Sequence, residues 1–356
     1  MALSVSNSVG TGVSRRARLG NRYTAYGAWL FLCGSACGSN VVDVGDEPGA
    51  ADTRDAGAIG PTLRVDSGSP DDIGASKCAI ENLRQYRLVF DSDGGKLERR
   101  IYSMRADGSE LQALTPVDEL AREPAVSPDG TQLAYTTPEG IKLLDLGTGQ
   151  SELLVPEADQ PAWSPDGTRL AYRIGLEPNT ALVVLLLSDR ASEAHYLSGY
   201  LASSPGWSPD GLSVVYASAR EGVDPIPQLR SHTLGTFEER LLAPGATIRQ
   251  NHPTVSLDGI WVAAAFQCAG TTHSSLWTSP FAVTTPACEG RRVTRADAAT
   301  ATNPEWGPGV LIAYERSEPP RDVAIIAADT GDECVIERLG DDRNPSWVPD
   351  LFRSPE

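Results

Sequence analysis

The sequence predicts an all-β fold, a six-bladed β-propeller, and three observations lead to it. A phrase of the form Pro-x-Trp-Ser-Pro-Asp-Gly, or a degenerate version of it, recurs six times, and five copies are followed by a short apolar run. Successive copies start 37 to 51 residues apart, at Pro124, Pro161, Pro205, Pro253, Pro304 and Pro345. Four short strands in a period of about 40 residues are typical of a propeller blade.

The first copy shows how each unit builds four strands. An extended segment at 124–126 leads into the turn Pro128-Asp129-Gly130, where proline fixes φ and glycine accepts a positive φ, and the apolar residues 133–135 return as a second strand. Two further segments rich in strand-forming residues follow at 141–146 and 151–155. We therefore expect every repeat to form one four-stranded antiparallel blade.

The two ends of the repeat region complement each other. Strand-like segments at 88–90, 101–104 and 111–114 come before the first copy and lack a Pro-x-Trp strand of their own. The last copy, residues 345–350, has no strands after it. We predict that this C-terminal strand pairs with the N-terminal strands, which completes the sixth blade and leaves no long open sheet edge.

The N-terminal region has the organisation of an export signal. Residues 1–36 contain several arginines and no acid, then an apolar run at 26–33 that is too short to span a bilayer. Gly34-Ser35-Ala36-Cys37 resembles a bacterial lipobox, which implies lipidation of Cys37; plain cleavage after Ala36 is the alternative. Residues 37–77 carry eight acidic and three basic side chains and are expected to form a disordered tether before a propeller at 78–356.

Charge and cysteine content limit the classes of partner and the cellular compartment that suit the chain. Acidic residues outnumber basic ones 47 to 30, which disfavours nucleic acid as a partner because phosphate backbones need clustered Lys and Arg. Export permits disulfides among the cysteines of the propeller region, with three pairings open and free thiols as the alternative. These cysteines are Cys78, Cys268, Cys288 and Cys334, and none lies in the C-x-x-C pair of a zinc or redox site.

Residues 101–115, followed by a Ser-Pro-Asp-Gly unit, resemble the TolB-type propeller repeat, and the resemblance extends over roughly residues 85–350. It implies a binding or assembly scaffold in the periplasm or at the outer membrane, with envelope proteins as partners. The lipobox-like Cys37 adds a lipid anchor in the membrane, and the residues predict no cofactor. A monomer remains open. Similar propellers also serve in peptidases that carry a hydrolase domain and in polysaccharide lyases, so a lyase or hydrolase is one alternative. A sensor for a glycan or small polar ligand is another.

Catalytic and metal chemistry find little support. No Gly-x-Ser-x-Gly elbow occurs, and the histidines stand singly in different repeats at positions 195, 232, 252 and 273. Lyases with similar propellers hold a metal with several inward histidines, whereas this chain offers one. The repeated aspartates, Asp129, Asp166, Asp210 and Asp258, are expected to stabilise turns, and the repeated tryptophans, Trp163, Trp207, Trp306 and Trp347, to pack between blades.

A polar residue stands directly before each repeated proline, where the chain enters the innermost strand. These channel-ring residues are Glu123, Gln160, Ser204, His252, Asn303 and Asn344. Two interpretations are open: a solvated channel rim, or a ring of hydrogen-bonding groups that receives a peptide terminus, a loop or a small polar ligand. In either case we expect the six side chains to stand in water, so that their replacement leaves the fold intact.

Overall fold

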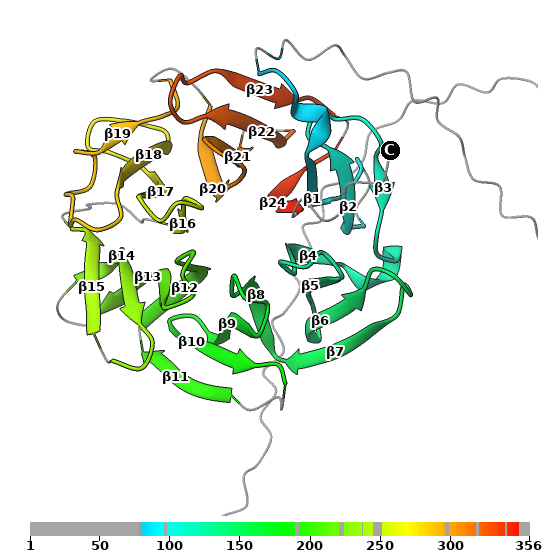
Figure 1. Ribbon diagram of the computed structural model, residues 1–356, viewed down its shortest axis with the longest axis horizontal. Coiled ribbons are helices and arrows are strands. Elements are labelled where there is room, and N and C mark those ends of the chain that lie inside the picture. Colours follow the sequence, from blue (N-terminus) through cyan, green and yellow to red (C-terminus); the bar gives the residue numbers. More distant parts are fainter. Residues whose placement is uncertain are drawn as a thin grey trace, which may run out of the picture. The chain divides into compact units, whose positions relative to one another are not determined.

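The predicted six-bladed, all-β propeller is confirmed. The computed structural model describes residues 78, 80–95, 98–188, 192–198, 200–220, 224–236, 238–244, 251–295, 299–317, 320–338 and 340–348. These residues form six four-stranded antiparallel sheets arranged around a common centre (Figure 1). The two helical segments within the described ranges are single 3-10 turns, η1 (Leu83–Gln85) and η2 (Val117–Glu119), and neither is long or apolar enough to cross a membrane.

Five blades each take four strands consecutive in sequence, and one blade, called the first here, combines the two ends of the propeller. That first blade consists of β24 (Arg343–Val348), β1 (Arg87–Ser92), β2 (Arg100–Arg105) and β3 (Gln112–Ala113). The second consists of β4 (Arg122–Val126), β5 (Gln132–Thr137), β6 (Gly140–Asp145) and β7 (Ser151–Pro156). The third consists of β8 (Ala158–Trp163), β9 (Arg169–Leu176), β10 (Asn179–Leu186) and β11 (Ser192–Ser198).

The remaining blades follow the same scheme. The fourth consists of β12 (Tyr200–Trp207), β13 (Ser213–Arg220), β14 (Asp224–Thr233) and β15 (Glu238–Ala243). The fifth consists of β16 (Asn251–Val255), β17 (Trp261–Phe266), β18 (Ser275–Pro280) and β19 (Arg291–Arg292). The sixth consists of β20 (Ala301–Trp306), β21 (Leu311–Arg316), β22 (Asp322–Ala327) and β23 (Glu333–Ile336). In Figure 1 the strands nearest the centre are β24, β4, β8, β12, β16 and β20, one from each blade.

The hydrophobic core is divided among the junctions between blades. Each of six apolar clusters joins two neighbouring blades; one, for example, unites Val89 of β1 with Leu133 and Tyr135 of β5. The repeated tryptophans take part in these junctions, as predicted. The indole Nε1 of Trp163 donates to the carbonyl of Ala125 in the preceding blade at 3.0 Å, and the tryptophans of β12 and β24 repeat this bond. These three indoles each fix one inner strand against the next, whereas Trp306 Nε1 donates to the Gly309 carbonyl of its own blade at 3.2 Å.

The repeated Pro-Asp-Gly segments form the expected turns between first and second strands. In the first copy Asp129 Oδ1 accepts hydrogen bonds from the Ser127 hydroxyl at 2.6 Å and from the Thr131 amide at 3.0 Å. The Ser127 hydroxyl bond is the main reason that the pKa of Asp129 lies below its usual value. The same bonds recur at the other three aspartates, so their role in the turns is confirmed.

The ends of the propeller meet as the sequence predicts. Strand β24 pairs antiparallel with β1, with Trp347 opposite Leu88 and Ser346 opposite Val89. A disulfide between Cys78 and Cys334, 256 residues apart in sequence, links the start of the described chain to β23. The N-terminal strands are thus tied to the C-terminal part of the chain both by strand pairing and by a covalent bond.

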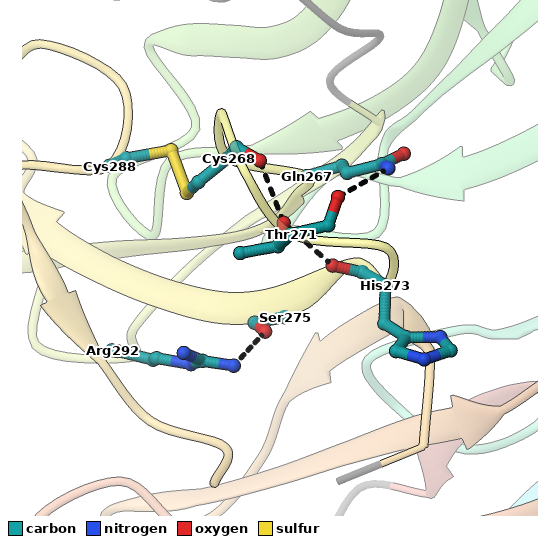
Figure 2. The surroundings of a disulfide bond; sticks show 7 residues. All are labelled: Gln267, Cys268, Thr271, His273, Ser275, Cys288 and Arg292. Atoms are coloured by element: carbon teal, nitrogen blue, oxygen red, sulfur yellow. Dashed lines mark hydrogen bonds between the residues drawn. A yellow bond between two sulfur atoms is a disulfide. The ribbon is translucent and has the colours of Figure 1, made fainter. Parts of the chain in front are cut away.

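The second disulfide, Cys268–Cys288, braces the outer part of the fifth blade. Figure 2 shows it beside the turn between β17 and β18, where the Thr271 hydroxyl donates to the Cys268 carbonyl at 2.7 Å. The Gln267 side chain donates to the Thr271 carbonyl at 3.0 Å in the same turn. Of the three pairings open from sequence, the structure has 78 with 334 and 268 with 288. Cys37, the predicted signal at 1–36 and the predicted tether at 37–77 lie outside the described residues.

Candidate functional site

The six channel-ring residues share one unusual backbone conformation. Each lies in the innermost strand of its blade with a positive φ between 49° and 55°. At each of these positions the inner strand carries one extra residue relative to its neighbour; for example, Arg122 pairs with Thr136 but Ala125 pairs with Ala134. The same register shift occurs in the other five blades. Each channel-ring residue is therefore the extra residue of a β-bulge, a device that bends a strand and re-aims a side chain.

Left-handed backbone is costly for residues other than glycine, and hydrogen bonds hold several of these bulges in place. The amide of Glu123 donates to Asp91 Oδ1 at 3.1 Å, and the amide of Gln160 donates to Glu123 Oε2 at 3.2 Å. The amide of Ser204 then donates to Gln160 Oε1 at 2.8 Å. In each case the acceptor side chain comes from the neighbouring blade, so these bonds couple one bulge to the next.

The chain of bonds continues across the seam between the two ends of the propeller. Asn303 Nδ2 donates to Asn344 Oδ1 at 2.6 Å and to Glu315 Oε2 at 2.8 Å. Asn344 Nδ2 donates in turn to Asp91 Oδ1 at 2.7 Å. A continuous belt therefore runs from Asn303 through Asn344, Asp91, Glu123 and Gln160 to Ser204. The prediction that all six side chains stand in open water is wrong, because four of them bond to a neighbouring blade.

The belt is interrupted in the fourth and fifth blades. Within the described ranges, the Ser204 hydroxyl and the His252 imidazole have no hydrogen-bond partner. The reason lies on the second strands: where other blades supply a polar support such as Asp91 or Glu315, these two blades have Ala217 and Ala265. We call Ser204 and His252 the open sector of the ring.

Burial shapes the electrostatics of the ring. Removal from water, and after it the positive charge of Arg173, lowers the pKa of His252 to about 4, so its imidazole is neutral at pH 7. Burial, together with the negative charge of Asp159, raises the pKa of Glu123. Burial also raises the pKa of Asp91, against the opposing effect of Arg99. The ring is thus a partly desolvated polar surface and not a set of freely hydrated charges.

All six ring residues line one central cavity of about 630 Å³, within the size range of ordinary ligand sites. The opposite end of the cavity is bordered by residues of the inter-strand turns, Pro128, Pro165, Pro209, Leu257 and Pro308. Between the two ends the wall is formed by the repeated prolines and tryptophans and by mostly small side chains. The cavity therefore combines a polar end with a largely apolar interior.

The sequence of the propeller region identifies the family to which the chain belongs. A family model described as the TolB beta propeller domain matches residues 85–351. The chain belongs to this family. Among curated proteins no sequence relative matches.

Two solved structures of TolB proteins resemble the chain. TolB from Acinetobacter baumannii matches with a TM-score of 0.65 at 20% identity, over 75% of this chain and 67% of that one. A putative TolB from Agrobacterium tumefaciens matches with a TM-score of 0.56 at 19% identity, over 73% and 91% of the two chains. An oligogalacturonate lyase in complex with manganese reaches 0.52 at 14% identity, over 71% and 74%. At these identities the matches show a common fold and nothing finer.

The histidines of this TolB-type propeller stay apart. His252 lines the channel, His232 is buried in β14, and exposed His273 contacts the Thr300 hydroxyl at 3.1 Å. His195 belongs to β11. No three His, Cys, Asp or Glu side chains in the described part of the chain are grouped so that they could hold a metal ion.

Two residues important to the channel were missed from the sequence. Asp91 joins the bulges of the first and second blades, and Glu305 contributes a carboxylate to the cavity wall. A signal for Asp91 exists, because it is a charged residue directly after the apolar run Leu88-Val89-Phe90 of a buried strand. A signal for Glu305 exists too, because the equivalent repeat positions carry Ala, Gly, Thr or Ser.

Proposed function

We propose that the protein is a non-catalytic binding scaffold of the bacterial cell envelope, which receives a segment of a partner protein in its central channel. One observation carries this proposal: a cavity of about 630 Å³ whose polar end includes two side chains, Ser204 and His252, without a hydrogen-bond partner among the described residues. Desolvated polar groups of this kind gain when a ligand bonds to them. Membership of the TolB propeller family agrees with a role in the envelope.

The composition of the cavity favours a polypeptide over a sugar or a metabolite. Its interior is formed largely by proline, tryptophan and small residues, which suit the apolar parts of an extended chain. The open sector offers a hydroxyl and a neutral imidazole, which can bond to peptide amides and carbonyls without a change of charge. The residues of the belt on the opposite side are already hydrogen-bonded to one another, so the belt keeps that part of the cavity wall rigid.

The proposed location is extracytoplasmic. Two disulfides within the propeller suit an oxidising compartment, because cytosolic proteins rarely keep structural disulfides. The arginine-rich start, the lipobox-like Cys37 and the acidic segment at 37–77 support export followed by lipid anchoring through a tether. Plain secretion is the alternative, and mass spectrometry of the mature N-terminus in the native host distinguishes the two.

Affinity capture from native envelopes with matched baits tests the scaffold function. The test bait is a Ser204→Ala/His252→Ala double variant, in which no hydrogen bond between described residues is removed. The control bait is Glu238→Ala, at an exposed position on the outermost strand β15. We expect the wild type and the control to recover the same partner and the double variant to lose it. Equal recovery by all three baits, with unchanged melting temperatures, contradicts binding at the channel.

A further inference from the structure

One carboxylate in the cavity wall has no partner among the described residues. Glu305 lies on β20, two residues beyond Asn303, and lines the cavity. Within the described part of the chain its side chain makes no hydrogen bond and no ion pair, and its oxygens are not fully enclosed. Its surroundings remove it from bulk water, and this burial raises its pKa to about 7. A desolvated carboxylate without a partner is unfavourable unless a ligand supplies one.

The repeat makes this position exceptional. The equivalent residues of the other inner strands are Ala125, Ala162, Gly206, Thr254 and Ser346. Each is small, and the indoles of Trp163 and Trp207 from the next blade bond to the backbone carbonyls of Ala125 and Ala162. Glu305 keeps that contact, because Trp347 Nε1 donates to its backbone carbonyl at 3.0 Å. The backbone that carries this carboxylate is therefore fixed.

The formal charges of the described cavity lining are all negative. Its described residues include two carboxylates and neither lysine nor arginine. The other carboxylate, Glu123, already accepts bonds from the Thr136 hydroxyl at 2.8 Å and from the Gln160 amide at 3.2 Å. Glu305 is thus the one available anion in the described lining. A divalent metal ion needs several oxygen ligands, and no such group is found in the described ranges. A single carboxylate suits an organic cation instead.

We propose that Glu305 makes the channel a receptor for one organic cation, the ammonium or guanidinium group of a lysine or arginine side chain on the partner polypeptide. This inference rests on the proposed binding of a polypeptide in the channel and adds the chemistry of its anchor. The cation pairs with the Glu305 carboxylate in the interior, while the ring contacts the peptide at the polar end. An indole-rich wall is a further favourable setting for a cation.

Nuclear magnetic resonance titration of the full chain with blocked five-residue peptides tests the proposal. The central residue is lysine, arginine, norleucine or glutamate between glycines. We expect the lysine or the arginine peptide to bind and the norleucine and glutamate peptides to bind at least tenfold more weakly. In Glu305→Gln the affinity for the cationic peptide falls at least tenfold, whereas Glu238→Gln on the outer strand leaves it unchanged. The lysine and arginine arms identify which cation is preferred.

The pH dependence gives a second readout. A carboxyl of pKa about 7 is mostly neutral at pH 6 and mostly ionised at pH 8, so cation binding strengthens by nearly tenfold between these values. The other titratable or charged groups are Glu123 and His252 in the lining, and Glu315 and Arg343 on β21 and β24, two of the strands that contact β20. These remain in Glu305→Gln, so a pH dependence that persists in this variant belongs to them and contradicts our assignment.

The outcomes separate this inference from the function on which it rests. If the captured envelope partner binds wild type and Glu305→Gln equally, the cation anchor is wrong and the scaffold function stands. If the Ser204→Ala/His252→Ala variant also retains the partner, binding in the channel is wrong as well. Equal binding of lysine and norleucine peptides, or no binding of either cationic peptide at millimolar concentration, overturns the cation anchor directly.

Discussion

Removal of the last described strand tests how the propeller closes. A chain that ends before Arg343 loses β24, whereas a chain that ends after Val348 keeps it and serves as the control. The first truncation removes Trp347, a 9% exposed side chain whose loss alone costs roughly 3–5 kcal/mol. It also removes the two hydrogen bonds of Asn344 to Asp91 and Asn303, at about 1 kcal/mol each.

These losses amount to roughly 5–7 kcal/mol, before the ladder bonds between β24 and β1 are counted. Whole domains are stable by about 5–15 kcal/mol, so we expect the shorter chain to lose its cooperative unfolding transition. Calorimetry and circular dichroism of the two truncations measure this, with Cys78–Cys334 intact in both. A shorter chain that melts cooperatively within a few degrees of the control refutes closure by β24 as the basis of stability.

Two further predictions concern single side chains. Gly307→Ala places a Cβ 2.2 Å from Trp347 Cε2, and this overpacking should lower the free energy of unfolding by about 1–3 kcal/mol. Gly147→Ala is the control, because the nearest atom to its Cβ lies at 3.4 Å, and it should unfold in urea like the wild type. Equal stability of the two variants argues against the tight junction. The pKa of His252 is lowered from 6.5 in the unfolded chain to about 4 in the folded protein, so the unfolded chain takes up a proton first as pH falls. His252 therefore destabilises the fold progressively from pH 6.5 to 4, by up to roughly 3 kcal/mol. Urea melts at pH 7.5 and 4 should show a smaller acid loss in His252→Gln, and parallel losses contradict this.

The repeat made the fold predictable because every blade is built from the same kinds of strand and turn in the same order. Proline, aspartate and glycine at fixed offsets define each turn, and the unmatched strands at the two ends indicate where the ring closes. The disulfide pairing was not predictable, because Cys78 and Cys334 meet only once the propeller has closed. Sequence spacing alone holds no information about that contact.

The position of the channel ring was predictable, but its chemistry was not. Bulged residues with positive φ are usually marked by glycine, whereas here ordinary polar residues adopt this backbone, and neighbouring blades bond to most of them. Whether a ring side chain is engaged depends on residues such as Asp91 and Ala265, which lie on other strands. That distinction separates the belt from the open sector, and it emerges only from the arrangement of the blades.

Site-specific photo-crosslinking in the native envelope tests the central claim most directly. A photoreactive amino acid is placed at Ser204 on the inner strand β12, at Thr254 on β16 within the cavity, or at Glu238 on the outermost strand β15. Binding in the channel predicts that the first two positions crosslink to the same partner protein and that the third does not. Crosslinks from Glu238 alone would contradict the account, because the partner would then contact the outer rim of the blades.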